Sequence, residues 1–151
     1  MGVELSDHEL RVFGVLIEKS LTQPDSYPLT MNAIRLGASQ KQNRNPVAEY
    51  TEADVSRAVY ALQQKDLVEQ APPVPGARAN RFAHRANEVL HWDRREQAIM
   101  AELMLRGRQT AGELRSRASR MTPLRDSESV AAVLEDMKRG DPPVVEELAR
   151  E

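Results

Sequence analysis

The chain contains no cysteine, so it can form neither a disulfide bond nor a zinc site built on thiolates. It also has no apolar run that approaches the roughly 20 residues of a membrane span. Its first residues lack the basic and apolar regions of a signal peptide. The net charge is −2, which differs from the strong positive balance of many nucleic-acid-binding proteins. Together these absences predict a cytoplasmic protein that does not enter a membrane.

Sequence motifs typical of enzymes are also missing. The seven glycines are scattered and form neither a GxGxxG motif nor a phosphate-binding loop. His8, His84 and His91 do not make the close i, i+4 pair of a helical zinc site, and we interpret each as a surface histidine. Glu146 and Glu147 fall on a predicted strand, where neighbouring side chains point to opposite faces. We therefore expect no catalytic or metal-binding residues, no cofactor and no small-molecule substrate.

A pattern of apolar residues occurs twice, 75 positions apart. Each set has the spacing of one buried face of a helix, which makes a turn every 3.6 residues. The two sets are Val55, Ala58, Val59 and Leu62, and then Val130, Val133, Leu134 and Met137. The elements around these sets repeat as well. We therefore predict a duplicated small helical domain, with a first domain at 1–85 and a second at 86–151.

The first domain is predicted to contain three helices followed by two strands. Ser6 and Glu9 form a capping box at the start of the first helix. The remaining elements are helices at 30–38 and 51–65 and strands at 67–70 and 80–84. Prolines and a glycine between the strands predict a tight turn. This order is that of a winged helix-turn-helix.

The second domain is predicted to repeat this order but to end early. Asp93 and Glu96 stand 87 positions after Ser6 and Glu9, and further helices are expected from Thr110 and at 126–139. A strand is expected at 142–148, with no returning strand after it. Two interpretations stay open: the natural protein continues beyond this chain, or the second wing has one strand. The predicted fold class is mainly α with small β-wings, in two tandem winged helix-turn-helix domains.

Trp92 lies at the junction of the two repeats, where it replaces Leu5 of the first. We interpret it as a core residue that packs against the start of a helix. The alternative is an exposed anchor for a dimer or another partner, a role that tryptophan often serves in interfaces.

Several short motifs follow one another in a distinctive order. In the first half they are Leu16-Ile17-Glu18-Lys19, Thr22-Gln23-Pro24-Asp25, Tyr27-Pro28-Leu29, Gln40-Lys41 and Asn43-Arg44-Asn45-Pro46-Val47. In the second half they are Leu105-Arg106-Gly107, Gln109-Thr110-Ala111-Gly112-Glu113-Leu114-Arg115 and Arg117-Ala118-Ser119-Arg120-Met121. This succession resembles the YceH-like bacterial family, domain of unknown function 480. The resemblance implies two tandem winged helices and a longer C-terminus, and it implies no catalytic or ligand-binding residues.

The leading functional hypothesis is binding of double-stranded DNA by the first domain. A helix-turn-helix inserts its recognition helix into the major groove, and cationic side chains neutralise phosphates. The candidate contacts come from the loop before the third helix, from that helix and from the wing. They are Lys41, Gln42, Asn43, Arg44, Asn45, Arg57, Arg78, Asn80 and Arg81. The alternative for this loop is structural, with Asn43 and Asn45 bonded to nearby backbone groups.

The third helices argue against strong DNA binding, because neither is basic. Residues 126–139 carry four carboxylates against two cations. The arginines beside that helix can pair with Glu113, Glu128 or a partner chain, or they can contact DNA. They are Arg115, Arg117, Arg120 and Arg125. The second functional hypothesis is therefore a protein–protein adaptor without DNA binding, and either function would suit a homodimer or a complex with another protein.

Overall fold

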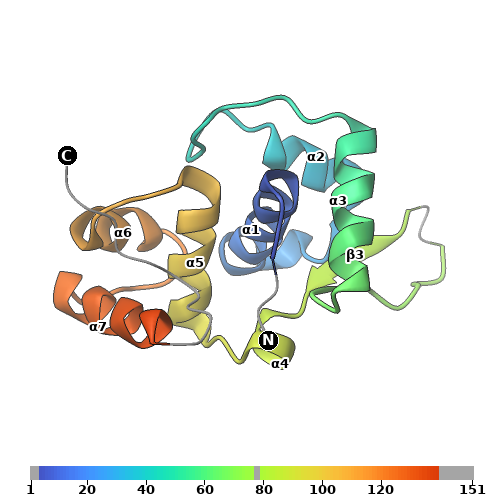
Figure 1. Ribbon diagram of the computed structural model, residues 1–151. Coiled ribbons are helices and arrows are strands. Elements are labelled where there is room, and N and C mark those ends of the chain that lie inside the picture. Colours follow the sequence, from blue (N-terminus) through green and yellow to red (C-terminus); the bar gives the residue numbers. More distant parts are fainter. Residues whose placement is uncertain (1–3, 77–78, 140–151) are drawn as a thin grey trace.

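The computed structural model describes residues 4–76 and 79–139. The chain begins with a long helix, adds two more helices and a small sheet, and continues into a second group of three helices (Figure 1). The elements are α1 (Asp7–Thr22), η1 (Pro24–Ser26), β1 (Leu29–Thr30), α2 (Met31–Ala38), α3 (Glu52–Gln64), β2 (Val68–Gln70), β3 (Arg81–His84), α4 (Ala86–Leu90), α5 (Arg94–Arg106), α6 (Ala111–Ala118) and α7 (Ser127–Lys138). We call α1 to β3 the first unit and α5 to α7 the second unit.

Short polar side chains set the starts of the helices, as the sequence predicts. The Ser6 hydroxyl accepts a hydrogen bond from the Glu9 backbone N–H at 3.2 Å, and the Glu9 carboxylate accepts from Ser6 N–H at 2.8 Å. The same reciprocal pairs begin α3, α5 and α6. Each pair satisfies N–H groups that have no partner inside the helix. The predicted helix starts at Ser6, Thr30, Asp93 and Thr110 are therefore confirmed.

The first unit carries a three-stranded antiparallel sheet in the order β1-β3-β2. Its hairpin, β2 and β3, confirms the two predicted strands, with Val68 opposite His84. The edge strand β1 was not predicted, and its Leu29 lies opposite Phe82. Because β1 is immediately followed by α2, the sheet fixes where the second helix begins.

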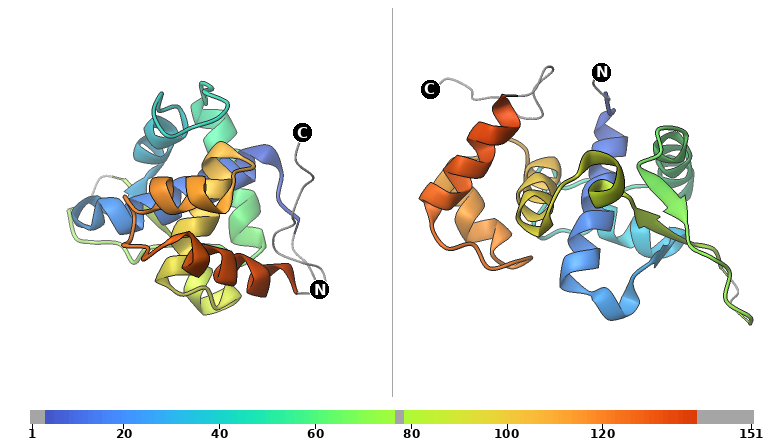
Figure 2. Two further views of the ribbon diagram at one scale, coloured as in Figure 1. Left: turned by 90° about the vertical axis from the view of Figure 1, so that its left-hand side faces the viewer. Right: turned by 90° about the horizontal axis from the view of Figure 1, so that it is seen from below.

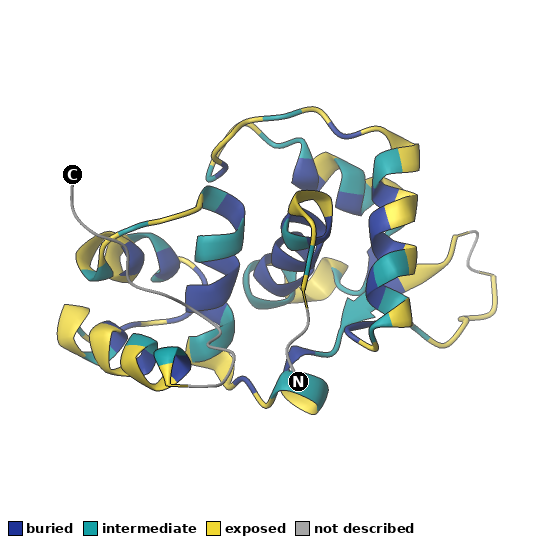
Figure 3. Ribbon diagram, viewed as in Figure 1, coloured by how far each residue is buried: buried dark blue, intermediate teal, exposed yellow. Residues whose placement is uncertain are grey.

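Helix α1 is at the centre of the molecule and is buried on nearly every side (Figure 3). In the sequence, the spacing of Leu10, Phe13, Ile17 and Leu21 predicts only one buried face for this helix. The second face is covered by α5, which lies between α1 and the pair α6 and α7 (Figure 2). Gly14 permits this close approach, because a Cβ at that position would lie 3.1 Å from the Leu105 side chain.

The core is continuous from the first unit into the second. Val55 and Val130, one from each predicted apolar stripe, are both 0% exposed, which confirms that the stripes face inward. Trp92 is buried beside Phe13, with 6.2 Å between ring centroids, so its predicted core role is also confirmed. The proposed boundary between residues 85 and 86 stays a prediction.

The chain is mainly helical with one small sheet, in agreement with the predicted α+β class. Residues 86–90, at the start of the predicted second domain, form the short helix α4. The strand predicted at 142–148 lies outside the described residues. None of the helices in the described part is long and apolar enough to cross a membrane.

Candidate functional site

The loop that joins α2 to α3, residues 39–51, carries most of the predicted DNA contacts. Lys41, Gln42 and Asn45 are exposed, whereas Asn43 is half-buried. A helix-turn-helix usually joins its two helices by a turn of three or four residues. The longer loop here has many backbone groups without partners in a helix or strand, so other parts of the chain must supply their hydrogen bonds.

The structure corrects the prediction at Arg44, which does not face outward as a DNA contact would require. Its side chain is 0% exposed, and two of its nitrogens lie 2.7 and 3.0 Å from the carboxylate oxygens of Glu18. Its Nε also donates to the Gly37 carbonyl at 3.1 Å. Arg44 therefore has a structural role in the loop, because a buried guanidinium is retained by a carboxylate partner.

Helix α3 presents a mostly uncharged face outward. Arg57 and Tyr60 are exposed there, and Arg57 pairs with Asp54 one turn away at 3.1 Å. From Ser56 to the end of the helix the exposed residues include no carboxylate. Because the Asp54 carboxylate also accepts from the Thr51 N–H at the start of the helix, at 2.9 Å, its charge is partly neutralised by the helix N-terminus.

The hairpin of the sheet contributes the remaining predicted contacts. Asn80 and Arg81 are exposed, and Arg81 Nη1 donates to the Pro28 carbonyl at 2.9 Å. Arg78 lies outside the described residues. A surface hollow of about 470 Å³ next to Arg81 is also lined by Lys19 and Asp25, and so it has no strong excess of either charge.

The predicted contacts do not form one cluster. The α2–α3 loop reaches back to α5, where the Asn45 N–H donates to the Leu105 carbonyl at 3.0 Å. The β2–β3 hairpin projects from the opposite side of the molecule (Figure 1). The loop tip and the α3–hairpin surface are therefore two separate groups of polar side chains.

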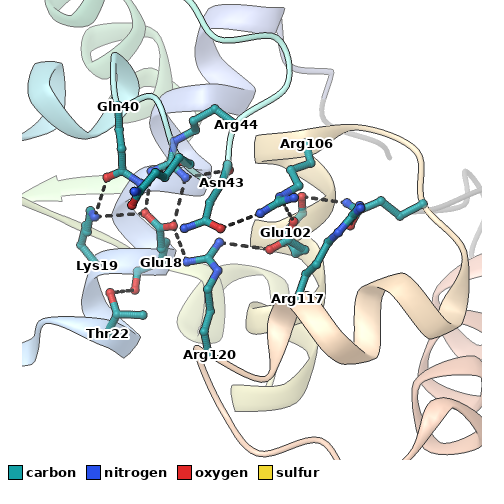
Figure 4. Close-up of polar contacts among 12 residues, drawn as sticks. Glu18, Lys19, Thr22, Gln40, Asn43, Arg44, Glu102, Arg106, Arg117 and Arg120 are labelled. Atoms are coloured by element: carbon teal, nitrogen blue, oxygen red, sulfur yellow. Dashed lines mark hydrogen bonds and ion pairs between the residues drawn. The ribbon is translucent and has the colours of Figure 1, made fainter.

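A network of charged side chains lies between the two units, around two buried carboxylates, and no sequence pattern predicted it (Figure 4). We call it the inter-unit ion network, consisting of Glu18, Arg44, Glu102, Arg106 and Arg120. Arg120 bridges the units, with Nη1 2.5 Å from Glu18 on α1 and Nη2 3.0 Å from Glu102 on α5. The carboxylates of Glu18 and Glu102 are 1% and 0% exposed.

The carboxylates of Glu18 and Glu102 differ in how well their hydrogen-bonding capacity is satisfied. Burial acts to raise the pKa of Glu18, but hydrogen bonds and charge from Arg44, with Lys19 and Arg120, outweigh it and leave this pKa below its ordinary value. Glu102 Oε2 lies 2.9 Å from Arg106 Nε, yet neither atom has a hydrogen bond of good geometry. This pair therefore relies on charge more than on directed hydrogen bonding.

Buried ion pairs of this kind fix a specific arrangement more than they add stability, because desolvation offsets the attraction. The partners come from four separate segments of the chain, and only Glu102 and Arg106 are linked by a local spacing, one turn apart on α5. One signal was present in the sequence: Glu18 follows Ile17, and Glu102 lies one turn after Ile99, on the apolar sides of their helices. A carboxylate at such a position requires a buried cation.

A second group of polar side chains links β3 to α1. His84 Nδ1 accepts from the Ala86 N–H at 3.1 Å, so the ring proton is on Nε2, which lies 3.1 Å from Ser20 Oγ. Ser20 in turn donates to the Ile17 carbonyl at 2.7 Å. The imidazole is thus a donor to the serine and cannot activate it as a general base.

His84 is the one histidine for which the surface interpretation is wrong. Burial lowers its pKa to about 4. The backbone N–H that faces Nδ1 also opposes a second ring proton. His8 and His91 are exposed, as predicted.

The arginines of the second unit are mostly occupied by nearby groups. Arg117 pairs with Glu113 at 3.2 Å, as one alternative predicts. Arg115 donates to the Leu124 carbonyl at 3.2 Å, and Arg125 is highly exposed with Asp126 at 3.7 Å. Among the described residues, no group of three His, Asp or Glu side chains could hold a metal ion.

Comparison with known proteins places the whole chain in one family. The model of the family described as "Protein of unknown function, DUF480" matches residues 5–151. A UPF0502 protein of Citrifermentans bemidjiense is 44% identical over 151 residues, covering 100% of this chain and 66% of the relative. A UPF0502 protein of Geobacter sulfurreducens is 44% identical over the same length and is covered to 68%.

A third relative, a UPF0502 protein of Paraburkholderia xenovorans, is 45% identical over 142 residues, with 94% of this chain and 59% of the relative covered. The chain therefore spans about two thirds of the length of these relatives. The chain belongs to the DUF480 (UPF0502) family.

Proposed function

We propose that the first unit is a winged helix that binds duplex DNA. The observation that carries this proposal is its topology. A helix, a short strand, two helices and a β-hairpin follow in order, and the sheet order β1-β3-β2 places the hairpin at the end of α3. In a winged helix-turn-helix the third helix enters the major groove and the hairpin follows the backbone or minor groove.

The exposed side chains of the first unit have chemical groups that suit DNA binding. On α3, Arg57 and Tyr60 face outward with Gln64, and they offer donors and an aromatic ring to base edges and sugars. Lys41 on the loop and Arg81 on the hairpin are also exposed, and their charges can neutralise phosphates. Arg44 is excluded from this set by its burial against Glu18.

Fluorescence anisotropy with a labelled random-sequence duplex tests the proposal. We expect the 151-residue chain to bind at low salt, with an affinity that falls steeply as salt rises. Lys41→Ala, Arg57→Ala and Arg81→Ala should each weaken binding, and removing one phosphate-neutralising cation should lower the salt slope by about one. The matched control is Arg125→Ala, since this exposed arginine lies on the second unit.

Absence of binding at low salt would overturn the proposal. An equal loss in Arg125→Ala would also contradict it, because affinity would then follow net charge and not the winged-helix surface.

The second candidate is a protein–protein adaptor, and one observation favours it. Tyr60 is 64% exposed on α3, and Leu36 on the neighbouring α2 is 55% exposed. Large exposed aromatic residues are common anchors in protein interfaces. An adaptor predicts no salt-sensitive DNA affinity, and a homodimer would use such a surface in both copies. Sedimentation of the parent chain and of the Tyr60→Ala variant tests whether the chain forms a homodimer through this surface.

A further inference from the structure

The α2–α3 loop is held from two sides. From the first unit, Arg11 on α1 donates to the Ala38 carbonyl at 2.7 Å and also to the Pro46 carbonyl. The Tyr50 N–H donates to Ser39 Oγ at 2.8 Å, which closes the base of the loop. These hydrogen bonds hold the two ends of the loop but leave its tip to other partners.

The tip is held by the second unit. Arg106, in the last turn of α5, donates from Nη2 to Asn43 Oδ1 at 2.5 Å. The Asn45 N–H donates to the Leu105 carbonyl at 3.0 Å. Figure 4 shows Arg106 of α5 and Asn43 of the loop pointing toward each other across the boundary between the units.

The inter-unit ion network adds an indirect connection between the second unit and the loop tip. Arg120 of the second unit binds Glu18 at 2.5 Å, and the same carboxylate holds Arg44 at 2.7 Å. Arg44 follows Asn43 in the loop, and its Nη1 donates to the Asn43 carbonyl at 2.9 Å. The second unit therefore reaches the loop tip both directly, through Arg106, and through Glu18.

We propose that the second unit sets the conformation of the α2–α3 loop and thereby positions Lys41 and Gln42 for DNA. In this proposal Arg106 and Arg120 are positioning residues that do not themselves read the nucleic acid. The role of Lys41 and Gln42 rests on the proposed function, whereas the control of the loop by the second unit does not.

The physical reason is conformational entropy. Ordering each backbone residue of an irregular loop costs conformational entropy, so a loop needs anchors spaced along its length. Lys41 and Gln42 lie between Gln40, whose side-chain oxygen is 3.1 Å from Lys19 Nζ, and Asn43. Removing the hydrogen bond from Arg106 would free one side of this short exposed segment.

Hydrogen exchange of the loop tests this control without DNA. In Arg106→Ala we expect exchange in residues 39–51 to rise at least about tenfold, while α3 keeps its protection. The matched control is Arg125→Ala, which should leave the loop unchanged. Unchanged exchange of the loop in Arg106→Ala would overturn the proposal.

Two substitutions in the loop itself serve as controls for a general effect of Arg106→Ala. Asn43 has a φ of 61°, so Asn43→Gly keeps the backbone conformation but removes the acceptor for Arg106. Asn43→Asp retains an acceptor. We expect faster exchange of the Asn45 N–H, which donates to the Leu105 carbonyl, in Asn43→Gly than in Asn43→Asp, and equal exchange would contradict the role of the Arg106–Asn43 hydrogen bond.

A double-mutant cycle tests positioning as distinct from direct contact. Lys41→Ala and Arg106→Ala should each weaken DNA binding about fivefold, and the double variant should be no weaker than either alone. Additive losses would show that Arg106 contacts DNA independently and would overturn its positioning role. If the parent chain binds no DNA at low salt, the proposed function fails, and the exchange experiment alone decides whether the second unit holds the loop.

Discussion

The first and second units start their helices with the same side-chain caps but connect their second and third helices differently. In the first unit residues 39–51 form a long loop that reaches the other unit, and in the second residues 119–126 make a shorter connection. The long loop contains Arg44, whose carboxylate partner is shared with Arg120 from the shorter connection. Two similar helical patterns can thus acquire different roles through the segments between their helices.

The largest expected effect comes from removing a buried carboxylate of the network. Glu18→Ala leaves Arg44 buried without its partner, and we expect the free energy of unfolding to fall by about 3–5 kcal/mol. Arg57→Ala breaks an exposed pair within one helix and should cost less than about 0.5 kcal/mol. Urea unfolding of both variants measures the difference, and similar losses would show that burial of the network does not matter.

The packing of α1 against α5 is tested by enlarging Gly14. Gly14→Val places methyl groups against Leu105 and Met104, and we expect a loss of about 2 kcal/mol. Gly112→Val in α6 is the matched control, because a Cβ there would meet only Thr110 Oγ1 at 3.9 Å. Urea unfolding compares the two, and equal stabilities would mean that the units do not approach closely at Gly14.

Acidification tests a contribution to stability that comes from the first unit, through its histidine His84. Its pKa is lowered to about 4 in the folded chain, against about 6.5 when unfolded, so the unfolded state takes up more protons between these values. The stabilisation is complete above pH 6.5 and is lost as the pH falls toward 4. We expect a loss of about 2 kcal/mol between pH 7 and pH 4.5.

The comparison for this prediction is His84→Gln, which can keep both hydrogen bonds but does not titrate. Unfolding by urea across this pH range should show a flatter profile for the variant. An identical slope in both proteins would assign the acid sensitivity in this range to groups other than His84.

The last comparison concerns what the two units share. Ser6→Ala and Asp93→Ala remove equivalent helix caps, and each should cost about 1 kcal/mol. Thermal unfolding of the two variants measures these losses. A large loss for only one of them would show that the caps of the two units are not equivalent.

Much of the fold could be predicted because its signals are local. The capping pairs at Ser6 and Asp93 and the apolar spacing around Val55 and Val130 depend only on neighbours within a few turns. The strand β1 could not be found in this way, because two residues give no alternation to detect. Helix α4 could not be found for a similar reason, because its five residues are too few to show an apolar period.

The candidate site was less accessible to prediction because its organisation depends on distant contacts. From the sequence, Arg44 and Lys41 are equivalent cations on one polar loop. In the structure Arg44 is buried against Glu18, whereas Lys41 stays exposed. Arg120 joins carboxylates from two different helices. To predict this arrangement, one must already know that α1 packs on α5.

The central claim is that α1 and α5 form one core that makes the two units a single cooperative body. Native-state hydrogen exchange in increasing denaturant tests it most directly, with the slowest amides of α1 compared with those of α5. We predict that both groups report the same free energy of opening and the same dependence on denaturant. Exchange of α5 to α7 through a separate, lower-energy opening, with α1 to α3 still protected, would contradict the claim.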